Sequence, residues 1–311
     1  MGMRALCLLA GLAALVAGPV LARCSDVVPG QRPQNTSRQY VGTTLDNIQD
    51  RGWIEFAVYE DFPPYSWEDN GTPKGVDIGI GQIIAESLGV EPRFRFGQAG
   101  ETLQTDLMAY VWRGTVLGQP VSNVMLRVPY DTSFACRVDQ VVFTGQYVTE
   151  EIGIAYARAA YPDVAAPPET DADGRHKEAP VPAFFRFDTV AVENDSIADF
   201  YLTAFPGGQI GPNIRRFPSM AKAMDALRAG EVMAAMGPMA QLQHGADASV
   251  GVHRPPLPGF ALSKWTVGVA VHQSHRDLAY AVDDAVAAAL TDGRIKALFA
   301  DYGLTFAPPV R

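Results

Sequence analysis

A strand–helix–strand pattern at residues 53–96 limits the possible folds of this chain more than any other feature. The segment WIEFAVY, from Trp53 to Tyr59, is typical of a β-strand. Apolar residues at helical spacing follow between Asp77 and Leu88, and Gly89 provides a helix stop. Glu91 to Phe96 then alternates as a strand does. Such a unit predicts an α/β protein whose sheet contains parallel strands.

Strands and helices continue to alternate toward the C-terminus. The residue pattern predicts further strands at 123–128, 140–143, 189–192, 232–236 and 265–271. It predicts helices at 196–202, after the N-cap residue Ser219, and from the capping box Ser274-x-x-Asp277 to about Leu290. Segment 162–182 is rich in proline and has no periodicity, which indicates an insertion loop. We therefore expect an α/β fold with two separate sheets.

The first 22 residues have the layout of a secretory signal peptide. A short basic start at Met1 to Arg4 precedes an apolar run of 16 residues, Ala5 to Val20. Val20-Leu21-Ala22 is a small-x-small site, so we expect cleavage after Ala22 and export to the periplasm. The alternative is an uncleaved N-terminal anchor, but the run is shorter than the ~20 residues that cross a membrane.

Composition and motifs exclude several functions. The formal net charge of −9 and the lack of a Lys/Arg cluster argue against nucleic acid as a partner. The sequence has no G-x-S-x-G elbow or Walker loop, and Gly79-Ile80-Gly81 lacks the third glycine of a dinucleotide loop. His272 and His275 are too few to hold a metal ion. We therefore expect no catalytic residues, no metal and no cofactor.

Two cysteines, Cys24 and Cys136, remain once the signal peptide is removed. An even number of cysteines in an oxidising compartment favours a disulfide between them. Two unpaired thiols, with Cys136 simply buried, are the alternative.

An aromatic loop directly after the first strand is the first candidate binding element. It contains Asp61, Phe62, Tyr65 and Trp67. Ligands of open α/β sheets bind beyond the carboxyl ends of strands, where aromatic rings can hold an apolar or cationic group. The same side chains could instead cover the edge of the sheet.

Two further candidates offer donors to an anion. Arg137 precedes a predicted strand, and its guanidinium could bind a ligand carboxylate or form a structural salt bridge. Asn194, Asp195 and Ser196 begin a predicted helix, whose free N–H groups favour anions unless these side chains occupy them.

Several segments, taken in chain order, resemble the family-3 solute-binding proteins that serve polar amino acid transporters. They are VYEDFPPYSW, GTPKGVDIGIGQIIAESLGV, RVDQVVFTGQYV, VAVENDSIADFYL and VGVAVHQSHRDLAYAVDDAVAAALTDGRIKALFADYGL. The resemblance implies a type II periplasmic-binding-protein fold, in which two α/β lobes are joined by two crossing strands. Residues 45–148 plus 268–311 would form lobe 1, residues 149–267 would form lobe 2, and residues 23–44 would be an N-terminal extension. A ligand would be trapped between the lobes by hinge closure.

The resemblance also assigns site residues. Arg137 falls where the family has its ligand-carboxylate arginine, Tyr65 and Trp67 in the aromatic wall, and Asn194 to Ser196 at the helix start that faces the ligand. The family's second-lobe acid, which holds an α-amino group, has no counterpart near Gly237 and Pro238. We therefore expect a carboxylate-bearing solute without an obligatory α-amino group.

Three function classes follow. The first is a monomeric, non-enzymatic receptor that passes a small solute to the membrane permease of an ABC transporter. The second is an accessory or maturation protein of a periplasmic PQQ-dependent methanol or alcohol dehydrogenase, since the departures at residues 121–136 and at Gly237 resemble that sub-branch. The third is a dehydratase-like enzyme on the same scaffold, for which Glu60 and Asp61 are the candidate acid and base.

Overall fold

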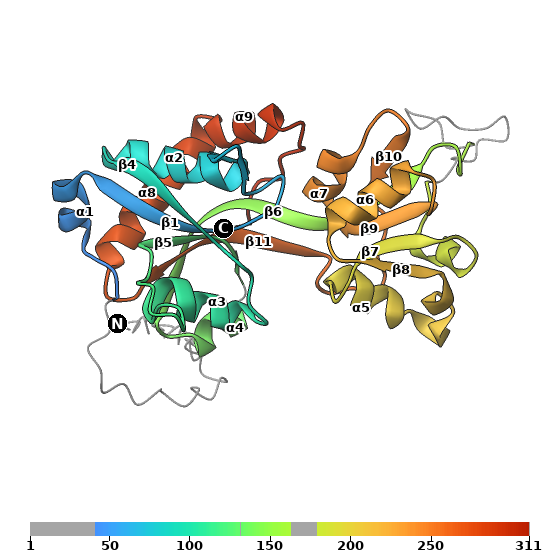
Figure 1. Cartoon of the computed structure of the whole chain (residues 1–311), viewed down its shortest axis with the longest axis horizontal. Coiled ribbons are helices and arrows are strands. Elements are labelled where there is room, and N and C mark those ends of the chain that lie inside the picture. The colour runs from blue at the N-terminus through green and yellow to red at the C-terminus, as the bar shows by residue number, and fades with distance from the viewer. Residues whose placement is uncertain (1–40, 131, 163–178, 311) are drawn as a thin grey trace, which may run out of the picture.

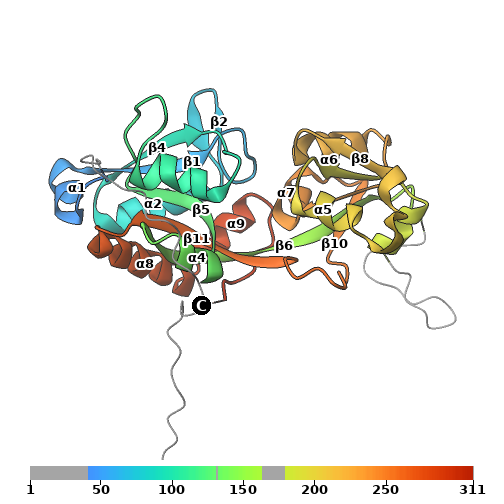
Figure 2. The same cartoon turned by 90° about the horizontal axis from the view of Figure 1, so that it is seen from below.

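The computed structural model describes residues 41–130, 132–162 and 179–310. Helices and strands gather into two bodies along the long axis, joined by the long strands β6 (Val141–Ala157) and β11 (Lys264–His272) (Figure 1). Figure 2, turned by 90°, shows the same two bodies with β6 and β11 running between them. The predicted signal peptide and Cys24 lie outside the described residues, so the cleavage site and the Cys24–Cys136 disulfide stay predictions.

The first body contains both ends of the described chain. Its elements are α1 (Leu45–Arg51), β1 (Trp53–Tyr59), β2 (Trp67–Asp69), β3 (Thr72–Lys74), α2 (Val76–Leu88), β4 (Glu91–Gly97), α3 (Leu103–Leu107), the π-helical turn η1 (Met108–Trp112), β5 (Val124–Tyr130), α4 (Thr132–Arg137), α8 (Arg276–Thr291) and α9 (Arg294–Asp301).

The second body is built from the middle of the chain. Its elements are the 3₁₀ turns η2 (Pro182–Arg186), η3 (Pro206–Gly208) and η4 (Gly211–Asn213), the strands β7 (Val190–Glu193), β8 (Ile214–Phe217), β9 (Ala234–Pro238) and β10 (Val250–His253), and the helices α5 (Ile197–Thr203), α6 (Met220–Arg228) and α7 (Met239–Gly245).

The strands confirm an α/β fold but not two separate sheets. β1 pairs in parallel with β4 and β5, and β7 pairs in parallel with β8 and β9. One hydrogen-bonded path, β4-β1-β5-β11-β6-β9-β7-β8, links both groups. The two sheets merge because β6 is 17 residues long. It pairs with β11 up to Glu151 and with β9 from Ile152 onward.

Local signals place most helix ends. Ser219 caps α6 by accepting a hydrogen bond from the backbone N–H of Lys222, as predicted. The predicted capping box at Ser274 is wrong, because His275 is the N-cap of α8 and forms no side-chain cap. Gly75, at φ 124°, precedes α2, and a Cβ there would collide with the Tyr65 carbonyl. This close approach sets the aromatic loop against the start of α2.

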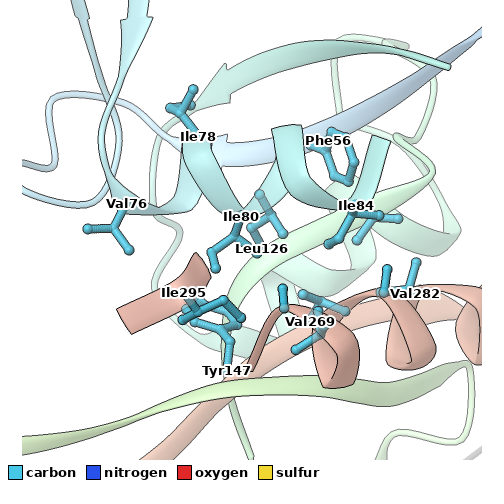
Figure 3. Packing of buried hydrophobic residues seen from close by; sticks show 14 of the residues in the cluster. Phe56, Val76, Ile78, Ile80, Ile84, Leu126, Tyr147, Val269, Val282 and Ile295 are labelled. Atoms are coloured by element: carbon cyan, nitrogen blue, oxygen red, sulfur yellow. The ribbon is translucent and has the colours of Figure 1, made fainter. Parts of the chain in front are cut away.

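Apolar side chains cover both faces of the sheet in each body. In the first body, α2 and α8 bury Ile80, Ile84 and Val282 against Leu126 and Val269 of the sheet (Figure 3). A second cluster, which includes Leu107 and Val111, covers the opposite face. The second body is organised in the same way, by two clusters that contain Val192 and Met224 respectively. Trp265 of β11 packs against one cluster of each body.

Within residues 41–130, 132–162 and 179–310, no helix is both long and apolar enough to cross a lipid bilayer.

Candidate functional site: a cleft between the two bodies

A cleft of about 790 Å³ lies where the two bodies meet the crossing strands. The first body contributes the loop after β1 and the end of β5, and the second contributes the ends of β7 and β9 and the starts of α5 and α7. The cleft is lined by Phe62, Pro129, Tyr130, Thr149, Ile152, Glu193, Ser196, Ile197, Ala198, Pro238, Gln241, Ala261, Leu262, Lys264, Trp265, Thr266 and Val310. Most of these side chains are apolar, so the cleft suits a largely apolar ligand.

Three aromatic side chains form the apolar wall. Phe62 follows β1, Tyr130 ends β5, and Trp265 lies near the start of β11. Each therefore lies at the end of a strand where the two bodies meet. Phe62 is held by Tyr59 and Tyr65, whose ring centroids lie 6.0 and 5.1 Å from its own. Such rings bind either an apolar group or a cation placed over their faces.

Glu193 is the acidic side chain in the lining. It is the last residue of β7, and its Oε2 accepts a hydrogen bond of 3.1 Å from the backbone N–H of Met220, the first residue of α6. Among the described residues, Oε1 has no hydrogen-bond or ion-pair partner. Burial raises the pKa of Glu193, and the Met220 hydrogen bond opposes that change. The fixed carboxylate can accept a hydrogen bond or pair with a cation.

The other polar groups of the cleft are neutral or already paired. Gln241 is only 9% exposed, and no described residue hydrogen-bonds its side chain. Ser196 caps α5 by accepting from the backbone N–H of Asp199. Lys264, at the rim, pairs with Glu151 at 3.2 Å. Glu193 and Gln241 are therefore the groups most available to a ligand.

The chain beyond α9 crosses the same junction. Gln243 of α7 and Thr305 exchange two hydrogen bonds of 2.8 and 2.9 Å. Thr149 of β6 donates from its backbone N–H to Ala307 and from its hydroxyl to Pro308. The segment 304–310 thus contacts a crossing strand and the second body before Val310 reaches the cleft.

A buried polar network lies behind Phe62 and anchors β6 to the first body. Arg127 of β5 donates to Glu150 at 2.8 Å and lies 3.8 Å from Asp77. Tyr65 donates to the same Glu150 oxygen at 2.6 Å, and Tyr147 donates to Asp77 at 2.7 Å. All five residues are at most 8% exposed. We call these five residues the Arg127 network.

A β-bulge aims Arg127 into this network. The register of β11 against β5 shifts between Gly268 and Ala270, so two residues of β5, one of them Arg127, face one residue of β11. Arg127 takes a left-handed conformation, at φ 58°, which is uncommon for a residue other than glycine. Its guanidinium carbon lies 3.0 Å from the centre of the Tyr65 ring. The positive charge of Arg127 is therefore paired inside the protein, with Glu150 and Asp77.

Asp77 makes stability depend on pH. Burial raises its pKa from 3.8 to about 6, and the nearby Arg127 opposes this rise. A carboxyl with a higher pKa in the folded state binds its proton more tightly when folded, so its contribution favours folding at low pH and is lost as the pH rises from about 4 to about 6. In the wild type, this carboxyl should lower the free energy of unfolding by about 3 kcal/mol over that pH range, at ~1.4 kcal/mol per pKa unit. We expect Asp77→Asn to lack this decrease. Urea unfolding at pH 4 and pH 7 measures it. An equal change in wild type and variant would contradict the assignment.

The four loop residues predicted for the site lie in different places in the structure. Phe62 lines the cleft. Tyr65 is fully buried in the Arg127 network. Trp67 contacts His244 and Tyr302, at ring distances of 5.9 and 5.8 Å, and is not a lining residue. Asp61 is exposed in the loop at φ 46°, also outside the lining.

The residues predicted to bind an anion lie mostly outside the cleft lining. Arg137 is exposed at the end of α4, and its guanidinium lies 5.8 Å from the Phe134 ring. Asn194 and Asp195 are exposed and bond to each other at 2.6 Å. Ser196 alone of this group lines the cleft. The carboxylate of Asp199 accepts from the Asp195 N–H, so this helix start already holds an anion of its own.

Sequence reasoning missed four residues that define the junction. Glu193 and Tyr130 end the observed strands β7 and β5 and lie one and two residues beyond the predicted ranges 189–192 and 123–128. The rule that ligands bind at carboxyl ends of strands could have found both. Trp265 had no comparable signal, because its role depends on the packing of both bodies. Arg127 lies inside a predicted strand, 123–128, and no local sequence pattern predicts the bulge that turns it inward.

In the described part of the chain, no group of three or more His, Cys, Asp or Glu side chains could hold a metal ion.

Comparison with known proteins identifies the fold. No protein-family model and no curated protein matches the sequence, whereas many solved structures match the coordinates. An ancestral cationic amino acid solute-binding protein matches with a TM-score of 0.64 at 20% identity, over 84% of this chain and 99% of that chain. The chain has the type II periplasmic-binding-protein fold. The predicted fold class is thereby confirmed.

Two further neighbours have similar coverage. A substrate-binding protein of an amino acid ABC transporter from Streptococcus pneumoniae, bound to L-arginine, matches with a TM-score of 0.56 at 16% identity, over 85% of this chain and 99% of that chain. An ancestral amino acid-binding protein, described as a precursor of cyclohexadienyl dehydratase, has a TM-score of 0.55 at 18% identity, over 83% and 98%. At these identities the likeness establishes the fold and not the ligand.

Proposed function

We propose that this chain is an exported solute-binding protein that captures a small solute between two lobes and presents it to the permease of an ABC transporter. The observation that carries the proposal is the cleft, because its lining comes from both bodies and from both crossing strands. We assign residues 45–148 plus 268–311 to lobe 1 and residues 149–267 to lobe 2. A ligand that contacts both lobes favours their closed arrangement.

Two adjacent residues of β6 suggest where the hinge lies. Glu150 is bound to Arg127 and Tyr65 of lobe 1. Glu151 pairs instead with Arg254, which follows β10, and with Lys264 of β11. Two adjacent residues of β6 are thus bound to different lobes, Glu150 to lobe 1 and Glu151 to lobe 2. This supports rotation of the lobes about the stretch of β6 next to Glu150 and Glu151.

A carboxylate-bearing solute remains the proposal that the sequence favours, through Arg137. Arg137 lies outside the cleft lining, so it would have to reach the ligand as the lobes close. The carboxylate of Glu193 in the cleft favours a cationic solute instead.

The accessory role with a quinoprotein dehydrogenase is the second candidate. It is favoured by the Arg127 network, whose cation Arg127 comes from the unusual segment before Arg137. The five side chains of the network fill the interior behind the aromatic wall. A dehydratase activity would need an acid or base in the cleft. Glu60 and Asp61 are exposed outside the lining, so Glu193 would have to serve.

A thermal-shift screen tests the receptor function. The folded protein should be stabilised by its solute through mass action, by about 2.7 kcal/mol at a solute concentration of 100 Kd. We expect at least one member of a panel of amino acids, amines, carboxylates and sugars to raise the melting temperature by several degrees. If no solute raises it, the receptor function is contradicted and the accessory role is favoured.

A further inference from the structure

One charged group in the lining of the cleft, Glu193, has no ionic partner among the described residues. Glu193 brings a carboxylate whose Oε1 has no partner among the described residues. The lining contains one cationic side chain, Lys264, which is 67% exposed and paired with Glu151 at 3.2 Å. Arg127 lies closest behind the wall and is neutralised by Glu150 and Asp77. Arg254 shares Glu151 with Lys264, and no described cation pairs with Glu193. Its carboxylate is therefore an unpaired charge on a largely apolar wall.

The packing around Glu193 fixes that charge at the lobe 2 wall. Met220 holds one carboxylate oxygen through its backbone N–H. The side chain of the same Met220 fills the space that a side chain at Gly237 would need. An acid at Gly237 would require Met220 to move, so Glu193 supplies the acid for this end of the sheet.

We propose that the cleft selects a small organic cation, an amine with an apolar body, whose charged group lies against Glu193 and whose body lies between Phe62, Tyr130 and Trp265. This inference rests on the proposed solute-binding function and specifies its ligand. A half-buried carboxylate is costly unless it is paired, and an amine provides both the charge and the hydrogen-bond donors. Aromatic faces stabilise a cation once water is excluded. Gln241, whose amide is unpaired, can accept a second hydrogen bond from the amine.

A matched set of three probes isolates the charge. Phenethylamine, 2-phenylethanol and 3-phenylpropanoate share an aromatic body and differ in a cationic, neutral or anionic end. By isothermal titration calorimetry on the full mature protein, we expect phenethylamine to bind at least tenfold more tightly than 2-phenylethanol. We expect 3-phenylpropanoate to bind most weakly, because it brings a second negative charge to Glu193.

Glu193→Gln separates charge from shape. Glutamine keeps an acceptor for the Met220 N–H and removes the negative charge. We expect this variant to bind phenethylamine at least tenfold more weakly and 2-phenylethanol within twofold of wild type. The control is Glu231→Gln, which removes the same charge from an exposed position outside the lining and should change neither affinity.

The possible outcomes separate this inference from the function on which it rests. Tighter binding of the carboxylate than of the amine, or an unchanged amine affinity in Glu193→Gln, would overturn the cation proposal. So would the absence of binding by all three probes. In each case, the receptor function would still be supported if a neutral or anionic solute raised the melting temperature in the thermal-shift screen. If neither the probes nor the screened solutes bind, both proposals fail.

Discussion

Arg127→Met is expected to lower the free energy of unfolding by about 3–5 kcal/mol, because removing one partner of a buried ion pair leaves the remaining charge uncompensated. Here two carboxylates, Glu150 and Asp77, would lose their cation at no more than 4% exposure each. Tyr65 would also lose the guanidinium that stacks on its ring. The loss should exceed that of an ordinary surface substitution several-fold.

Urea unfolding at pH 7, followed by tryptophan fluorescence, measures this effect. Arg113→Met is the matched control, because Arg113 is exposed and its side chain bonds only Met108 among the described residues, so we expect a change within about 0.5 kcal/mol. Adding Asp77→Asn and Glu150→Gln to Arg127→Met removes the uncompensated charges and should recover much of the loss. A loss below about 1 kcal/mol for Arg127→Met would contradict the structural role of the network.

Local patterns predicted the framework of lobe 1 well. β1 occupies the predicted residues 53–59, and α2 and β4 differ from their predicted ranges by one residue at one end. These elements are set by apolar periodicity and by glycines such as Gly89, which ends α2 in a left-handed conformation. Both signals act over a few neighbouring residues, so the sequence alone contains them.

The crossing strand β6 was predicted too short, at residues 140–143. The observed strand continues to Ala157 because it pairs with β11 and then with β9 and β10. Glu150 and Glu151 interrupt the apolar pattern of the strand, and adjacent acidic residues are typical of a solvated surface. Both are buried, since each has a cationic partner from a distant part of the chain. Such partners are invisible to a local pattern.

Two of the eight predicted site residues belong to the lining of the cleft. The carboxyl ends of strands do meet at the cleft, and Phe62 and Ser196 line it. Arg137 was predicted because it precedes a strand and falls where the family has its ligand-carboxylate arginine, whereas the cation in the interior is Arg127, which a bulge turns inward. The family's acid was expected near Gly237 of β9, whereas the carboxylate in the lining is Glu193, on the neighbouring strand β7. A choice between adjacent strands depends on packing, here that of Met220.

Filling the cleft should strongly weaken solute capture. Thr266 of the crossing strand β11 is half-buried, pairs with Thr149 of β6 and lines the cleft. A tryptophan at this position suits a strand and occupies space that the solute and the closing lobes need. We expect Thr266→Trp to weaken solute binding about 100-fold, or ~2.7 kcal/mol. Thr72→Trp, on an exposed strand position outside the lining, should bind as wild type does.

Calorimetric titration of wild type and Thr266→Trp with a solute that raises the melting temperature of the wild type is the most direct test of the cleft as the binding site. The account predicts one solute per chain for wild type and for Thr72→Trp, and no measurable binding to Thr266→Trp at the same concentrations. Equal affinity in Thr266→Trp and wild type would place the solute elsewhere and contradict the account.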